Sequence, residues 1–139
     1  MIPLKKEKLS DAEWKRHLQV YGGALTDDKK TWYPSKAAAD ASKSKDIGKL
    51  VNGKTLQDFE NIKDFLRPNM LRISGCNKVL VEGVTFENSP AWTTHFLMSK
   101  DITIKGMKVK NPWWGTNTDA IDLESCSNAI LEDCVFDTG

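Results

Sequence analysis

Long apolar segments are scarce in this chain of 139 residues. No apolar run approaches the roughly 20 residues that a membrane-spanning helix needs, so the sequence predicts no membrane partner. The N-terminal residues Met1–Lys6 contain no hydrophobic signal core, so no signal peptide is predicted in this chain.

Cysteine is scarce as well. Cys76, Cys126 and Cys134 form an odd set without the short spacings of a zinc site or a disulfide framework. We expect three free thiols that act as small packing residues. The sequence indicates no metal site and no cofactor.

A surplus of one charge sign is also absent. The chain has 20 basic and 19 acidic residues and a formal net charge of +1. Binding driven by bulk positive charge is therefore excluded, and no nucleic-acid partner is predicted. The lysine clusters near the N-terminus have acidic neighbours and are interpreted as solvated surface.

Two segments of different composition follow each other along the chain. Residues 1–66 predict a helical and loop segment, rich in Lys, Asp, Ala and Ser. Ser10 and Glu13 have capping-box spacing, which predicts a helix over 11–21 that ends at Gly22. We expect Trp14, Leu18 and Tyr21 on one face of this helix, and shorter helices at 35–42 and 55–65.

Residues 67–139 carry a repeat. The segments 79–88, 102–111 and 129–138 align without gaps at distances of 23 and 27 residues. Within each segment the apolar positions lie two, three and two residues apart, and period two indicates a strand with one buried face. The step of three contains Gly83, Gly106 or Asp133, where we expect a bend. The apolar columns are Val79/Ile102/Ala129, Val81/Ile104/Leu131, Val84/Met107/Cys134 and Phe86/Val109/Phe136.

Such a period is typical of a solenoid, in which each repeat buries its apolar face on the next. The Leu-x-x-Leu-x-Leu pattern of leucine-rich repeats is missing, so we prefer an all-β, right-handed parallel β-helix of about three coils. The same register predicts a third strand per coil, whose inward positions are Leu71/Thr94/Ile121 and Ile73/Phe96/Leu123. Between them, Arg72, His95 and Asp122 would face outward side by side, either as a strip for an acidic sugar or as an ordinary solvated face.

Residues 111–122 carry the strongest functional signal. Trp113 and Trp114 lie in a turn-rich loop, where they either stack on sugar rings or cover the end of a coil. Asp119 and Asp122 follow, and glycoside hydrolysis requires a pair of carboxylates. From spacing alone, two aspartates near a turn are more often capping or turn residues.

The motif Asn117-Thr118-Asp119-Ala120-Ile121-Asp122 resembles the Asn-Thr-Asp-(Gly/Ala)-x-Asp signature of family 28 of the glycoside hydrolases, the polygalacturonases. Asp137-Thr138-Gly139 resembles the start of that family's second signature, Asp-x-Gly-Asp-Asp. Further similar stretches are Arg67–Met70, Glu82–Thr85, Asn88–Trp92 and Leu123–Cys126, and the early segments at 3–15 and 32–35 resemble an insertion found in bacterial members.

The resemblance implies a right-handed parallel β-helix that hydrolyses α-1,4-linked galacturonan with inversion. By position, Asp119 corresponds to an aspartate that activates the attacking water, and Asn117 and Asp122 would orient the site. The predicted substrate-binding residues are Arg72, His95, Trp113 and Trp114. The implied partner is pectic polysaccharide, and the implied location of the parent enzyme is secreted or periplasmic.

In the family the general acid directly follows the glycine that Gly139 matches, and Gly139 is the last residue here. We therefore expect a polypeptide of these 139 residues to be inactive alone and to self-associate through open coil ends. The alternative is a non-catalytic β-solenoid that binds pectic carbohydrate or a protein partner.

Overall fold

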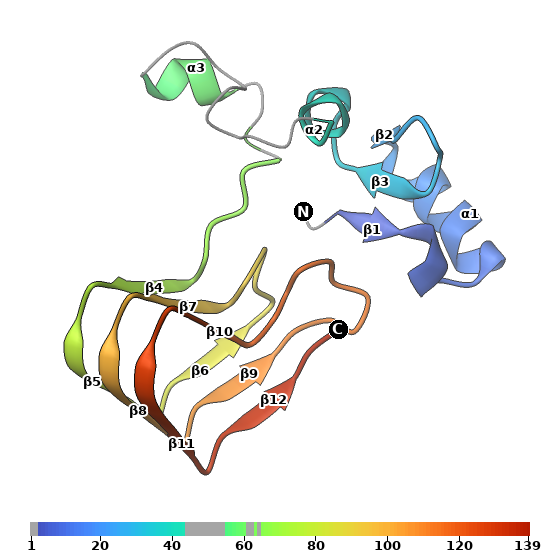
Figure 1. Ribbon diagram of the computed structural model, residues 1–139. Helices are drawn as coiled ribbons and strands as arrows, with labels where there is room; N and C mark the ends of the chain where they lie inside the picture. The colour runs from blue at the N-terminus through green and yellow to red at the C-terminus, as the bar shows by residue number, and fades with distance from the viewer. Residues whose placement is uncertain (1–2, 44–54, 61–62, 64) are drawn as a thin grey trace. The chain divides into compact units, whose positions relative to one another are not determined.

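The structure is a computed structural model that describes residues 3–43, 55–60, 63 and 65–139. Two compact units divide the chain, Met1–Arg67 and Pro68–Gly139 (Figure 1). None of the described helices is long and apolar enough to cross a membrane.

The predicted first helix is present as α1 (Asp11–Tyr21). Its capping box is formed, because the Glu13 carboxylate accepts the Ser10 amide N–H at 2.9 Å and the Ser10 hydroxyl accepts the Glu13 amide. Gly22 ends the helix with a φ of 61°. Trp14 is buried as expected, but Tyr21 is 55 % exposed, because it lies in the last turn and packs against His17 instead.

The sequence did not predict the small antiparallel sheet β1-β3-β2 of this unit. Its centre is Trp32, which is fully buried and donates its indole N–H to the Gly22 carbonyl at 2.6 Å. Gly23 packs so closely on the Trp32 ring that a Cβ atom there would clash with it. The elements are β1 (Leu4–Lys5), the 3₁₀ helix η1 (Lys6–Lys8), β2 (Ala24–Leu25) and β3 (Thr31–Tyr33).

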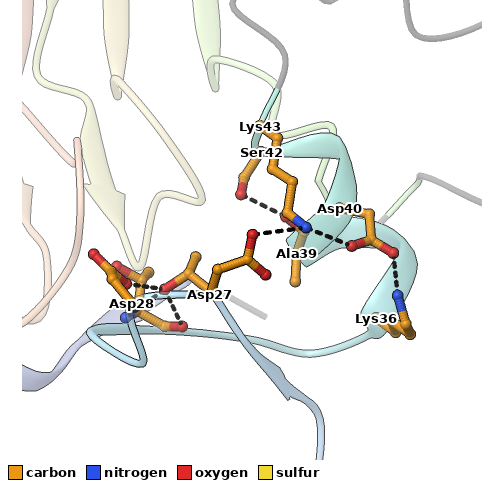
Figure 2. A network of polar contacts seen from close by, with 9 residues as sticks. Asp27, Asp28, Lys36, Ala39, Asp40, Ser42 and Lys43 are labelled. Atoms are coloured by element: carbon orange, nitrogen blue, oxygen red, sulfur yellow. Dashed lines mark hydrogen bonds and ion pairs between the residues drawn. The ribbon is translucent and has the colours of Figure 1, made fainter.

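The second helix is α2 (Lys36–Ala41), and the Ser35 hydroxyl caps it by accepting the Ala38 amide at 3.1 Å. Figure 2 shows the Lys43 ammonium between the carboxylates of Asp27 and Asp40, at 3.1 and 3.2 Å. Such exposed ion pairs contribute little to stability. The third helix is α3 (Leu56–Glu60), shorter than the predicted 55–65, and residues 61, 62 and 64 lie outside the described residues.

The second unit is the predicted right-handed parallel β-helix. Each coil contributes one strand to each of three parallel sheets, with the orders β10-β7-β4, β11-β8-β5 and β12-β9-β6 (Figure 1). The first coil is β4 (Leu71–Ser74), β5 (Asn77–Glu82) and β6 (Thr85–Glu87); the second is β7 (Thr94–Leu97), β8 (Lys100–Lys105) and β9 (Lys108–Lys110); the third is β10 (Ile121–Glu124), β11 (Ser127–Glu132) and β12 (Val135–Asp137).

The strand register matches the columns read from the sequence. Ile102 pairs with Val79 and Ala129, and Ile104 pairs with Val81 and Leu131. Val109 pairs with Phe86 and Phe136, and the third strand set pairs as expected, with Phe96 between Ile73 and Leu123. All three cysteines are free, as predicted.

The core is centred on the middle coil. Phe96, Ile102, Ile104, Met107 and Val109 are each at most 2 % exposed, because a coil covers them on both sides. In the third coil, the apolar side chains in the same columns are more open, with Leu131 41 % and Phe136 39 % exposed. The burial of a side chain therefore depends on whether its coil is covered on both sides as much as on its hydrophobicity.

Candidate active site

The sheet β4-β7-β10 brings the three predicted polar residues together. Arg72 and Asp122 are the register partners of His95 on either side. Arg72 is exposed and Asp122 is partly buried, but His95 is only 7 % exposed. The row exists as predicted, but its middle member is covered rather than open to solvent.

The loop before β10 is fixed through its backbone. The Thr93 amide donates to the Asp119 carbonyl at 2.8 Å. Thr94 donates both its amide and its hydroxyl to the Ala120 carbonyl, at 3.2 and 2.9 Å. Thr118 and Ala120 are buried while Asp119 between them is exposed. The chain therefore holds the Asp119 carboxylate outward on a backbone that is bonded to the preceding coil.

Asn111 anchors the start of the same loop. Its buried side-chain oxygen accepts the Ser89 amide at 2.8 Å, and its amide nitrogen donates to the Thr93 hydroxyl at 2.8 Å and the Thr118 carbonyl at 2.7 Å. Every polar atom of this side chain thus has a partner. Sequence reasoning missed this role, although an Asn placed directly after strand β9 and before a Pro was a usable signal.

Asp122 is a carboxylate whose environment favours its neutral form. Its Oδ2 atom is buried and has no hydrogen-bond partner. Burial raises the pKa of this carboxyl above its usual value, and the negative charges of Asp119 and Glu124 raise it further, while His95 opposes them. The Asp119 charge therefore acts on Asp122 as a nearby like charge, which favours the neutral form of the Asp122 carboxyl.

Two residues to which the sequence assigned no role, Glu124 and Trp92, enclose His95. The Glu124 carboxylate lies 3.1 Å from the His95 Nε2 atom. The Trp92 ring meets the imidazole edge-on, with ring centroids 5.4 Å apart and planes at 82°. These contacts explain the burial of His95 and leave little of its ring exposed. Its contact with the substrate stays a prediction.

The remaining predicted residues line the loop itself. Trp113 is 58 % exposed, whereas Trp114 is half-buried. Asn117 is exposed and has a φ of 55°, a left-handed turn conformation that Asn tolerates well.

The second predicted signature lies beside this loop. The Asn111 amide donates to the Asp137 carbonyl at 2.8 Å. The Gly139 backbone packs against the carbonyl of Trp113 so closely that a Cβ atom would not fit. The two motifs, separated in sequence, therefore meet at the same edge of the β-helix.

The described residues also form a hollow near the site, and they contain no candidate metal-binding group. The hollow of about 270 Å³ is lined by Glu87, Asn88, Lys110, Asn111 and Pro112, and does not include Asp119. Among the residues that the structure describes, no group of three or more His, Cys, Asp or Glu side chains is placed to hold a metal ion.

The second unit is thus a parallel β-helix with two aspartates, Asp119 and Asp122, before and in the outer strand β10 of one sheet, an exposed Trp113 in the preceding loop and an exposed Arg72 in the same sheet. Glycoside hydrolases cleave sugar bonds with carboxyl side chains that flank the glycosidic bond, and an exposed carboxylate at this edge is compatible with that class of enzyme.

Comparison with known proteins assigns the family. The sequence profile described as glycosyl hydrolases family 28 matches residues 51–139, and the chain belongs to that family. A polygalacturonase of Chamaecyparis obtusa is 34% identical over 91 residues, which is 66% of this chain and 17% of the relative. A polygalacturonase of Juniperus ashei is 32% identical over 91 residues, with the same two coverages of 66% and 17%.

The chain thus spans about a sixth of the length of these two relatives, 17% in each case. One solved crystal structure, of a protein from Parabacteroides merdae, aligns with 55% of this chain and 33% of its own at 23% identity and a TM-score of 0.45.

Proposed function

We propose that the whole protein containing this chain hydrolyses α-1,4-linked galacturonan in pectin, with inversion at the anomeric carbon. The observation that carries the proposal is the position of Asp119, which is exposed on a fixed backbone next to the perturbed carboxyl of Asp122. Membership of family 28 and the similarity to two polygalacturonases support the substrate class.

In this proposal Asp119 activates the attacking water. Its carboxylate is solvent-exposed and can reach a water molecule above the sheet. Asn117 and Asp122 orient the site from the same loop and strand. Activation by a positioned general base contributes about 10²–10⁴-fold to the rate.

The other proposed roles concern substrate binding. Arg72 supplies an exposed cation for the carboxylate of a galacturonate unit. Trp113, with 58 % of its surface exposed, supplies a flat apolar face for a sugar ring, and Trp114 extends it. For the parent enzyme we propose a secreted or periplasmic location, where pectin is found.

An inverting mechanism needs a general acid about 6.5–9.5 Å from the base, on the other side of the scissile bond. In the family signature this acid comes directly after the glycine matched by Gly139. A polypeptide limited to residues 1–139 is therefore expected to release negligible reducing sugar from polygalacturonate. Turnover near that of a complete family member would contradict this expectation.

The test of the function uses the protein expressed from its complete coding sequence. Asp119→Asn should lower the release of reducing sugar from polygalacturonate by about 10²-fold or more. Asp133→Asn is the matched control, because Asp133 is exposed at a corner with a φ of 52° and should be dispensable. Proton NMR of the first product should show the inverted anomer.

Two outcomes would overturn the proposal. Full activity of Asp119→Asn would remove Asp119 from the mechanism. Binding of oligogalacturonate without any hydrolysis by the complete protein would favour a non-catalytic solenoid, for which the exposed Trp113 supplies a binding surface.

A further inference from the structure

His95 is placed unusually for a member of an outward-facing polar row. It lies in β7 directly beside Asp122 of β10, yet it is only 7 % exposed. Glu124, two residues beyond Asp122 on the same face of β10, holds the imidazole Nε2 atom at 3.1 Å. Trp92 packs edge-on against the ring. A ring fixed on two sides and shielded from solvent is suited to act on its neighbours rather than on the substrate.

Charged residues surround His95 on β4, on β10 and in the loop before β10. Arg72 is its register partner on β4, and Asp122 is its partner on β10. Glu124 contacts it from β10, and Asp119 lies in the loop that leads into this strand. The carboxylates of Asp119, Asp122 and Glu124 therefore lie toward one end of the row, and the His95 imidazole is the group beside Asp122 that opposes the effect of the other two on it.

We propose that His95 is a positioning residue for Asp122, its register partner on β10, and that Glu124 and Trp92 hold its ring so that it stabilises the ionised form of Asp122. This inference rests on the proposed function of the same site. It goes further, because it assigns a role to the buried His95 imidazole. In this role His95 controls the protonation of Asp122, the aspartate proposed to orient the site.

The electrostatic balance at Asp122 supports this role. Burial and the charges of Asp119 and Glu124 raise the pKa of the Asp122 carboxyl, and among the contributing groups His95 is the one that lowers it. Without the imidazole, the carboxyl would hold its proton to higher pH. Asp122 would then become ionised only at a higher pH than in the wild type.

The first experiment measures the titration of Asp122 and needs no activity. In protein labelled with carbon-13 at the aspartate carboxyls, the Asp122 signal of His95→Gln should titrate at higher pH than in the wild type. His17→Gln is the matched control, because the chain has only these two histidines and His17 lies in the other unit. If the Gln variant does not fold, His95→Asn tests the same point.

The second experiment measures kcat/KM against pH in the complete protein. For His95→Gln we expect the acid limb to move to higher pH, with KM nearly unchanged at the optimum. A higher KM with an unmoved limb would show that His95 binds substrate directly, and a uniform loss of activity would show a merely structural role; either overturns the inference. An unmoved Asp122 titration overturns it as well.

The two experiments separate the inference from the proposed function. A moved Asp122 titration in a protein without hydrolase activity would refute the function while leaving the coupling of His95 and Asp122 intact. An active enzyme whose Asp122 titration does not respond to His95→Gln would refute only the coupling.

Discussion

At the scale of single residues, Asp122 shows how the fold changes the chemistry of a common side chain. Its carboxyl lies at the end of a row of parallel strands, where burial and two nearby carboxylates favour the neutral form. Its Oδ2 atom is buried without a hydrogen-bond partner. Ionising this group in the folded protein is therefore harder than ionising it in the unfolded chain.

This difference gives a pH-dependent prediction. Because the pKa of Asp122 is raised in the folded state, its contribution favours folding below the ordinary aspartate pKa and is lost as the pH rises through the raised value. Asp122→Asn should therefore raise the Tm relative to the wild type at pH 7, and the gain should shrink toward pH 3. A gain that is independent of pH would indicate a cause other than ionisation.

The sequence identified the row of Arg72, His95 and Asp122, because alternation in a strand sorts side chains by face. It did not identify the burial of His95. That burial depends on the Trp92 and Glu124 side chains, whose positions are set by the turn before β7 and by the pairing of the next coil. Contacts between coils of this kind are not encoded in the local pattern.

At the scale of elements, the corners between strands repeat as regularly as the strands. Gly83, Gly106 and Asp133 have φ values of 65°, 62° and 52° at the predicted bend. Two further columns of left-handed residues were not predicted, because their members have little in common chemically: Gly75/Met98/Ser125 and Lys78/Asp101/Asn128. Stacking imposes the same backbone turn on each coil regardless of side chain.

Gly83 allows the cost of a corner to be measured cleanly. A Cβ atom at this position would meet nothing within 4 Å, so only the backbone conformation opposes a side chain. Gly83→Ala should lower the free energy of unfolding by about 1–2 kcal/mol, the cost of a left-handed L-residue. Gly83→Asn should cost less, since Asn tolerates this conformation. Urea titration measures both, and equal losses would show that the side chain clashes after all.

At the scale of the whole molecule, the most buried apolar side chains of the β-helix lie in its middle coil. Fold class and register could be predicted, because columns of apolar residues at a fixed period leave few other ways to bury them. The three short strands of the first unit could not, since none exceeds three residues and their pairing depends on the buried Trp32. Differences in burial between coils follow from stacking rather than from residue type.

One apolar column tests this dependence on position. Ile104 is fully buried in the middle coil, while Leu131 beside it in the third coil is 41 % exposed. Ile104→Ala should lower the free energy of unfolding by about 2–5 kcal/mol, the usual range for a buried aliphatic side chain. Leu131→Ala should cost clearly less. Similar losses at both positions, measured by urea titration, would show that the third coil is covered in solution.

The central proposal is that parallel coils hold Asp119 outward and that Arg72, Trp113 and Trp114 form a binding surface for an acidic sugar. The most direct test is nitrogen-15 NMR of the five tryptophan indole N–H groups during titration with trigalacturonate. We predict that the Trp113 and Trp114 signals shift, that these shifts are lost in Arg72→Gln, and that the signals of Trp14 and Trp32 stay in place. Unmoved Trp113 and Trp114 signals, or shifts confined to Trp14 and Trp32, would contradict it.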